Sequence, residues 1–152
     1  MDKKRLNDQL NFGLLKELEF LECICKYFDN NSFIKTSTYF PLDFEILNDK
    51  KENVGWIELK SRVYKNDINL YISTSKLEHV HQFNFENVFL IWNDVNKNLY
   101  YVVKLTKRNL YNIKRTKTIL LYNQQTSDIN KKYAKCFNNI EEVAEYIKLF
   151  IK

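Results

Sequence analysis

The spacing of apolar residues predicts an amphipathic helix near each end of the chain. Between residues 6 and 28, apolar side chains recur every three or four positions, which is the period of one helix face. They are Leu10, Leu14, Leu18, Leu21, Cys25 and Phe28. Ile140, Val143, Ala144, Ile147 and Phe150 share a face in the same way. Asn139 precedes this second helix and is suited to cap it, because its side chain can accept from a free backbone N–H.

The segments that follow the first helix have the patterns of strands. We expect three strands, at residues 33–39, 42–47 and 55–64. The polar loop 48–53 predicts that the second and third form a hairpin. Ser73 can then cap a short helix over residues 74–83.

A continuous apolar run marks a further strand at residues 87–92, and this composition favours a central strand covered on both faces. A turn at 93–98 leads to a return strand at 99–105. In the basic segment 106–125, a helical turn near Arg108 and a strand at 118–122 both fit the pattern. The element order predicts an α/β fold with one sheet flanked by helices and a C-terminal helix, in a single domain over residues 1–152.

Composition restricts the class of protein. Hydrophobic residues make up 45% of the 152 residues and aromatics 15%, which is too apolar for a disordered chain. No apolar run approaches the roughly 18 to 20 residues that span a bilayer, and the N-terminus lacks a signal-like apolar core. We therefore expect an intracellular protein that is neither secreted nor inserted in a membrane. Cys23, Cys25 and Cys136 have no CxxC spacing, so we expect buried or half-buried free thiols.

Charge is unevenly distributed along the chain. The net charge is +5, yet residues 95–127 contain no acid. That segment holds seven cations, which are Lys97, Lys104, Lys107, Arg108, Lys114, Arg115 and Lys117. A basic segment interleaved with tyrosines indicates contact with nucleic acid, and the alternative is a solvated lysine face.

Two neighbouring predicted strands carry charged residues at two-residue spacing. Glu58, Lys60 and Arg62 project from one face of a strand whose other face is apolar, and Asp43 and Glu45 form a second row on the preceding strand. Charges in an interior strand are costly unless they line a site. If the hairpin joins the rows, two carboxylates and an ammonium converge. Carboxylate oxygens are ligands for Mg²⁺ or Mn²⁺, and a nearby lysine can position water or stabilise phosphate oxygens.

The same residues resemble the motifs of the PD-(D/E)xK nuclease superfamily. Pro41-Leu42-Asp43 takes the place of the PD element, with one residue inserted, and Glu58-Leu59-Lys60 takes that of the ExK element. Three acid-x-Lys triplets occur in the chain, but only this one lies in an apolar strand. The resemblance extends over residues 6–105 and leaves the basic extension 106–152 uncovered. Within the superfamily, the chain resembles small nucleases of phages and large DNA viruses, with a Holliday-junction-resolvase-like or restriction-endonuclease-like core.

This resemblance implies a restriction-endonuclease-like core in the order αβββαβ, with Mg²⁺ or Mn²⁺ as cofactor. Asp43, Glu58 and the carbonyl of Leu59 would bind the metal, and Lys60 would assist the attacking water. Gly13 and Glu17 match a G-x-x-x-E element of the first helix, which would place Glu17 at the site. Lys76 matches a site residue on the helix after the ExK strand, and Arg62 is a candidate phosphate contact.

The sequence therefore predicts a metal-dependent nuclease that hydrolyses phosphodiester bonds, with DNA as substrate. Glu45 remains a rival to Asp43, and Glu22 to Glu17. The alternative function is a catalytically inactive, nucleic-acid-binding or virion-associated protein with the same fold; a third is an interaction subunit that binds an acidic protein. The resemblance also leaves a homodimer open. The basic residues expected to contact nucleic acid are Arg62, Lys76, Lys104, Lys107, Arg108, Lys114, Arg115 and Lys117.

Overall fold

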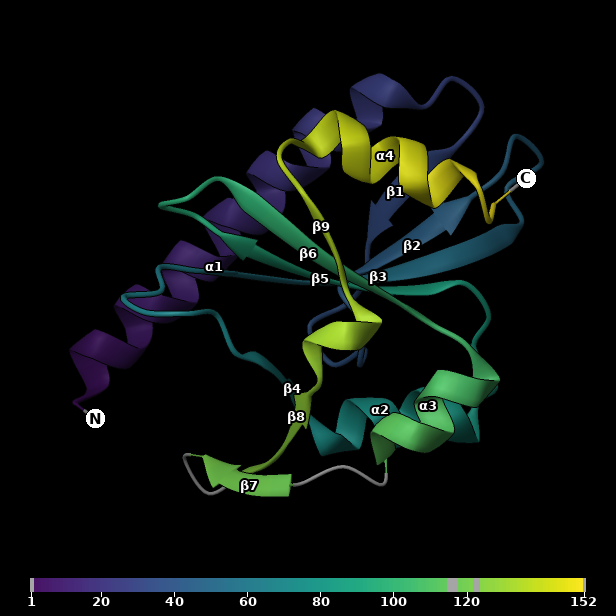
Figure 1. Cartoon of the computed structure of the whole chain (residues 1–152). Helices are drawn as coiled ribbons and strands as arrows, with labels where there is room; N and C mark the ends of the chain where they lie inside the picture. Colours follow the sequence, from purple (N-terminus) through teal and green to yellow (C-terminus); the bar gives the residue numbers. More distant parts are fainter. Residues whose placement is uncertain (1, 115–117, 122–123, 152) are drawn as a thin grey trace.

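The computed structural model describes residues 2–114, 118–121 and 124–151 and has mixed α/β architecture (Figure 1). The helices are α1 (Lys3–Ile24), α2 (Thr74–Gln82), α3 (Lys107–Lys114) and α4 (Ile140–Lys148), with short 3-10 helices η1 (Cys25–Tyr27) and η2 (Lys131–Tyr133). The strands are β1 (Ser32–Lys35), β2 (Phe44–Leu47), β3 (Asn53–Arg62), β4 (Leu70–Ser73), β5 (Val88–Asp94), β6 (Leu99–Leu105), β7 (Thr118–Leu121), β8 (Gln124–Ile129) and β9 (Lys135–Phe137).

Six strands form the main sheet, in the order β1-β2-β3-β5-β6-β9. All neighbours are antiparallel except β3 and β5, which run parallel with Trp56 opposite Val88 and Arg62 opposite Asp94. A parallel pair needs a crossover connection, and β4 and α2 lie within it. The strand β5 is central and its first five residues are buried, so the predicted central strand is confirmed.

Helices cover both faces of this sheet. On one face, α1 and α4 pack through residues such as Phe20 and Ile147 onto Phe44, Ile57 and Phe89. The other face carries α2 and α3, and its core includes Leu77, Ile113, Leu90, Trp92 and Val103. Figure 1 shows α4 above the sheet and α2 and α3 below it. The predicted sheet flanked by helices, with the order αβββαβ and a C-terminal helix, is confirmed, with β4 as an addition between β3 and α2.

A second sheet of three strands, in the order β4-β8-β7, was not predicted. Its middle strand, β8, has the sequence QQTSDI, which lacks the apolar alternation of a typical strand. Thr126, Ser127 and Ile129 are nevertheless buried. The sheet is tied to the main sheet by Trp92, whose indole N–H donates to the Tyr71 carbonyl at 3.1 Å. The prediction of only one sheet was therefore wrong.

The apolar face predicted for the first helix was also wrong over most of its length. Leu10, Leu14 and Leu18 are 64%, 48% and 50% exposed, whereas Phe20 and Ile24 are buried. The N-terminal end of α1 projects past the sheet (Figure 1), so the leucine side chains there have no core to pack against. The C-terminal helix follows its prediction: Val143, Ala144 and Ile147 are buried, and the Asn139 side chain accepts from Glu142 N–H at 2.9 Å.

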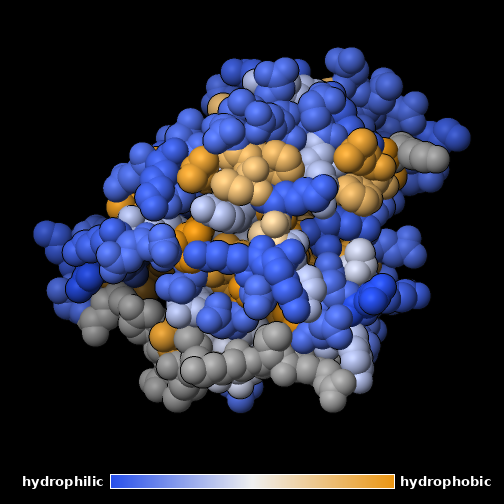
Figure 2. All heavy atoms as spheres, viewed as in Figure 1, coloured by the Kyte–Doolittle hydropathy of each residue, from blue (hydrophilic) through white to orange (hydrophobic). Residues whose placement is uncertain are grey.

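The surface seen in Figure 2 is mainly hydrophilic, with apolar side chains gathered over β9 and the C-terminal end of α4. The cysteines are free, as expected, but Cys25 and Cys136 are exposed rather than buried, because both lie in short elements at the surface. Within the described residues, no helix combines the length and apolar composition needed to cross a membrane.

Candidate active site

A cleft of about 470 Å³ opens beside the C-terminal half of β3, and it collects most of the predicted site residues. Its wall combines the middle of α1, the segment between β1 and β2, the strand β3, and the first turn of α2. The predicted residues that line it are Glu17, Asp43, Glu58, Leu59, Lys60, Arg62 and Lys76. Positions as far apart in sequence as 17 and 76 thus meet in one hollow.

Asp43 is held rigidly by backbone contacts at the entry to β2. Its N–H donates to the Ile57 carbonyl at 3.0 Å, and its carboxylate Oδ2 accepts from the Leu59 N–H at 2.8 Å. The Thr36 N–H and hydroxyl both donate to the Asp43 carbonyl, each at 2.9 Å. The segment after β1 therefore turns back on itself instead of continuing as the strand predicted to residue 39. Asp43 is fixed next to β3 by this turn.

Glu58 is the buried carboxylate of the cleft, with 3% of its surface exposed. Its Oε1 forms an ion pair with the Lys76 ammonium. Its Oε2 is buried without a hydrogen-bond partner among the described residues. Burial raises the pKa of Glu58 to about 8, and the charge of Asp43 adds to the increase, while Lys76 and Lys60 oppose it. Near neutral pH, this carboxyl group therefore holds a proton far more readily than a glutamate in water.

Lys60 lies two residues further along the same face of β3. Burial lowers the pKa of this ammonium to about 8, with Lys76 and Arg62 contributing through repulsion and Glu58 and Asp43 opposing the shift. Near neutral pH, Lys60 therefore gives up its proton far more readily than a lysine in water. This property suits a group that handles a proton at a reacting water.

Glu17 reaches the cleft from α1 and pairs with Lys35, with 2.6 Å between Oε2 and Nζ. Gly13 lies one turn earlier, and a Cβ at this position would be in ordinary contact with Nη1 of the exposed Arg62, at 4.0 Å. Arg62 Nη1 also donates to the Ser61 carbonyl at 2.9 Å. Lys35 ends β1 and Thr36 follows it; neither was predicted as a site residue, because the strand pattern does not indicate that the chain turns toward β3 at this point.

The two rival carboxylates lie elsewhere. Neither Glu45 nor Glu22 lines the cleft. Glu45 lies on β2, two residues after Asp43, and is opposite Ile34 of β1 and Trp56 of β3. Glu22 lies on α1 beyond Glu17 and is exposed.

Most of the basic segment is separate from the cleft. Lys104 and Lys107 line another hollow, of about 480 Å³, and the Lys104 ammonium lies 4.7 Å from the centre of the Phe150 ring. Arg108 is exposed on α3. Arg115 and Lys117 lie outside the described residues, as does the side chain of Lys114 and the last residue of the strand predicted over 118–122.

The donors of the cleft are suited to a hard cation that keeps part of its water shell. No group of three or more His, Cys, Asp or Glu side chains arranged for a metal occurs among the residues that the structure describes. Mg²⁺, however, is commonly held by one or two carboxylates, with water completing the shell. Asp43 and Glu58 provide that number, and the unpartnered Oε2 of Glu58 is the oxygen that lacks a positive partner. The residues present therefore fit a magnesium or manganese ion.

No protein-family model and no curated protein matches the chain. Among solved structures, the chain is similar to Hjc, a Holliday junction resolvase from the archaeal hyperthermophile Archaeoglobus fulgidus, with a TM-score of 0.47 and 16% sequence identity. The similarity covers 86% of this chain and 97% of that chain. Similarity of this extent does not transfer an activity, so function has to be derived from the side chains of the cleft.

Proposed function

We propose that this protein is a metal-dependent nuclease that hydrolyses phosphodiester bonds in DNA. One observation carries the proposal: Asp43 and Glu58 share a cleft with Lys60 and Lys76, and the buried Glu58 retains an oxygen that has no partner among the described residues. Buried oxygens of Asn93 and Asp94 also lack a partner among the described residues, so what distinguishes Glu58 is the cleft that it shares with a second carboxylate and two lysines. Carboxylates paired with lysines in this way suit a site that handles a phosphate and a cation together.

Asp43 and Glu58 would hold the ion, with the Leu59 carbonyl as a third donor. A bound Mg²⁺ or Mn²⁺ supplies a water of lowered pKa and neutralises charge on the phosphoryl group. Asp43 is preorganised for this role, because the 2.8 Å bond from the Leu59 N–H fixes its carboxylate.

The lysines handle the proton and the negative charge. Lys60, with its pKa lowered to about 8, can hold a proton toward a phosphate oxygen or accept one from water near neutral pH. Lys76 orients Glu58 through their ion pair. Glu17 and Lys35 form a pair at the α1 side of the cleft and position the wall there. Arg62 is exposed at the mouth, where it can contact the phosphate backbone.

Cleavage assays test the proposal. Purified protein is incubated with plasmid, linear and branched DNA, and with RNA, in Mg²⁺ or Mn²⁺. We expect DNA cleavage, and a loss of at least about a hundredfold in Asp43→Ala and Lys60→Ala, the range of one general acid–base group. Glu45→Ala is the matched control, because this carboxylate lies on the neighbouring strand outside the cleft. No cleavage of any substrate, or equal activity in all three variants, rejects the proposal.

Metal binding gives a readout that does not depend on turnover. In calorimetry with Mg²⁺ or Mn²⁺, the wild-type protein should bind the ion and Glu58→Gln should bind it much more weakly. Glu45→Gln should bind it as the wild type does. Equal binding by all three proteins would remove the metal site from the proposal.

A second candidate function rests on the ion pair between Lys76 and Glu58. Because an ammonium already contacts one carboxylate oxygen, the cleft also suits a protein that binds nucleic acid without a metal or turnover. DNA binding that depends on salt, is indifferent to Mg²⁺ and is never followed by cleavage would favour this candidate. The main proposal keeps DNA as the substrate. It also includes a homodimer, in which each copy would cut one strand of a duplex.

A further inference from the structure

Four aromatic side chains form a ladder of rings beside the cleft. Phe40 and Trp56 are stacked, with 5.0 Å between ring centres and 16° between planes. Phe85 lies 4.8 Å from Trp56 and 5.9 Å from Phe40, and Phe83 lies 6.0 Å from Phe85, so three of the rings contact one another and Phe83 adjoins them. These four residues, called here the aromatic ladder, come from three separate segments: the loop before β2, the strand β3, and the loop after α2.

The aromatic ladder is accessible to solvent, in contrast to the rings of the core. Phe83 is 58% exposed, and Phe40, Trp56 and Phe85 are half-buried. The other tryptophan, Trp92, is 1% exposed. Phe40, Trp56 and Phe85 pack against one another and against the core, but each keeps some surface exposed, and Phe83 keeps most of its surface exposed.

One end of the aromatic ladder lies in the cleft. Phe40 lines the cleft together with Asp43 and Glu58. Trp56 precedes Glu58 by two residues on β3, so both side chains project from the same face of the sheet, about 7 Å apart along the strand. A nucleotide next to a phosphate at Glu58 would have its base within reach of the Trp56 ring.

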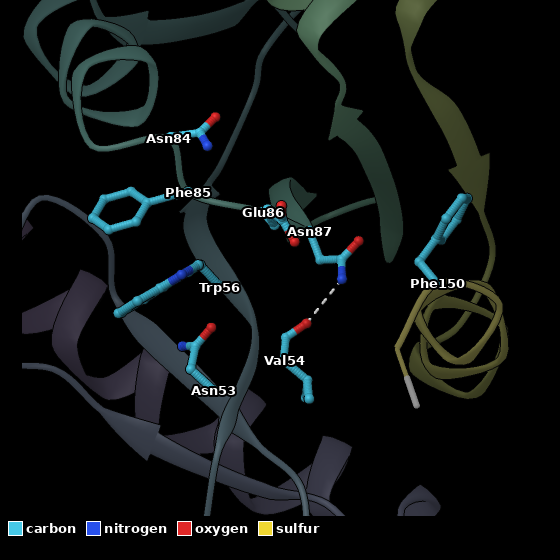
Figure 3. A pocket seen from close by; sticks show the side chains of 8 residues that line it. All are labelled: Asn53, Val54, Trp56, Asn84, Phe85, Glu86, Asn87 and Phe150. Atoms are coloured by element: carbon cyan, nitrogen blue, oxygen red, sulfur yellow. Dashed lines mark hydrogen bonds between the residues drawn. The ribbon is translucent and has the colours of Figure 1, made fainter.

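Two inner members of the ladder, Trp56 and Phe85, border a second pocket, and Phe85 also borders a hollow that contains lysines. Trp56 and Phe85 lie at one side of a pocket of about 590 Å³, shown in Figure 3, in which Asn87 donates to the Val54 carbonyl at 3.0 Å. The hollow that contains Lys104 and Lys107 shares Phe85 and Asn87 with this pocket. The rings thus mark a path between the cleft, which Phe40 lines, and the hollow of Lys104 and Lys107, which Phe85 lines.

Glu86 lines both hollows and is exposed. Its carboxylate repels a phosphate, so the middle of the path suits bases rather than backbone. The charges that attract phosphates lie at the two ends, in Lys60 and Arg62 on one side and in Lys104 and Lys107 on the other.

We propose that the aromatic ladder is a stacking platform for unpaired bases, so that the cleft takes a substrate with a single-stranded segment next to the phosphate it contacts. This inference rests on the proposed function for its substrate, phosphodiester-linked nucleic acid. Aromatic rings bind bases of any sequence by stacking, while lysines neutralise the intervening phosphates. A blunt duplex keeps its bases stacked on one another and cannot use the platform.

The test is a binding titration of the full chain in EDTA, where no metal-dependent cleavage occurs. Fluorescence anisotropy compares labelled oligo(dT), an RNA oligo(U) of the same length, and a blunt hairpin with the same number of phosphates. We expect tighter binding of a single strand than of the hairpin, with the two oligonucleotide arms showing whether DNA or RNA is preferred. Tryptophan emission should fall on single-strand binding, because Trp56 is partly exposed and Trp92 is buried.

Phe83→Ala is the decisive variant, because its ring is exposed enough to be removed without opening the core. It should weaken single-strand binding about five- to a hundredfold, the range for one base on one ring, and leave hairpin binding unchanged. Leu149→Ala, also at an exposed apolar residue (75%) but at the end of α4, is the control and should change neither. Trp56→Phe keeps an aromatic ring at this position and should reduce single-strand binding less than Phe83→Ala.

Equal loss on both substrates, an effect of Phe83→Ala no larger than that of Leu149→Ala, or a preference for the hairpin would overturn the inference. Each of these results is independent of cleavage. If the protein cleaves DNA but Phe83→Ala does not weaken single-strand binding, only the stacking platform is overturned. If single strands bind through the aromatic ladder but no cleavage occurs in Mg²⁺ or Mn²⁺, only the proposed nuclease is overturned.

Discussion

Replacing Glu58 by glutamine should change how the stability of the metal-free protein depends on pH. In the folded chain, burial and the charge of Asp43 raise the pKa of Glu58 from 4.5 to about 8. The unfolded chain has the ordinary value. Between these two limits the folded state binds more protons at this residue, so its contribution to the free energy of unfolding is fully present below pH 4.5 and is lost as the pH rises to 8.

The size of the effect follows from the same interval. It corresponds to about 3 to 5 kcal/mol over the whole window, with the upper value as a ceiling. Lys60 does not contribute here: its pKa is lowered from 10.5 to about 8, so the stability linked to Lys60 is lost as pH falls from 10.5 to 8 and does not change further below that window. Below that window, the pH dependence of the wild type therefore reflects Glu58 rather than Lys60.

Urea unfolding in EDTA, followed by the emission of the buried Trp92, measures the difference at several pH values. The free energy of unfolding of Glu58→Gln, relative to that of the wild type, should rise by several kcal/mol from pH 5 to pH 8, because glutamine cannot ionise. Glu45→Gln shows what the loss of a carboxylate outside the cleft does. Parallel curves for the wild type and Glu58→Gln, within about 1 kcal/mol, would refute the reasoning that burial dominates at Glu58.

Three further predictions concern the ion, the packing and the path beside the cleft. Mg²⁺ should raise the melting temperature of the wild type more at pH 8 than at pH 6, because a metal ligand must give up its proton. Calorimetric scans of the wild type and Glu58→Gln check this, and the effect of Mg²⁺ on the melting temperature of the variant should not increase with pH. Gly55→Ala should destabilise the fold by about 1 to 3 kcal/mol, because its Cβ would lie 3.0 Å from the Asn87 carbonyl oxygen and 3.2 Å from Ile46; an unchanged urea midpoint would contradict this. Glu86→Gln should tighten binding of oligo(dT) in EDTA by removing repulsion, an effect that anisotropy should show shrinking at high salt.

The central part of the fold was predictable because its physical constraints are local. A strand buried on both faces must be apolar throughout, and Val88–Trp92 shows this directly in the sequence. Two-residue spacing likewise places Glu58 and Lys60 on one face, and the hairpin brings Asp43 beside them. The strand β8 was missed because its burial comes from tertiary contacts, with Thr126 and Ser127 covered despite being polar.

The first helix shows the opposite error. Leucines at helical spacing predict a buried face only where another element covers that face, and nothing in the local pattern tells how far a helix extends past its sheet. The aromatic ladder was missed for a related reason. Phe40 and Phe85 lie in loops, where no periodicity indicates that they meet Trp56.

The charged residues that line the cleft have a consequence for the order of assembly at the site. Glu17, Asp43 and Glu58 face four cations there, namely Lys35, Lys60, Arg62 and Lys76. The raised pKa of Glu58 reduces the negative charge further near neutral pH. The side chains of the cleft alone are therefore attractive to a polyanion, without a contribution from a metal ion. Under the proposed function, nucleic acid and metal can arrive in either sequence, and the association rate should fall with ionic strength even when the metal is withheld.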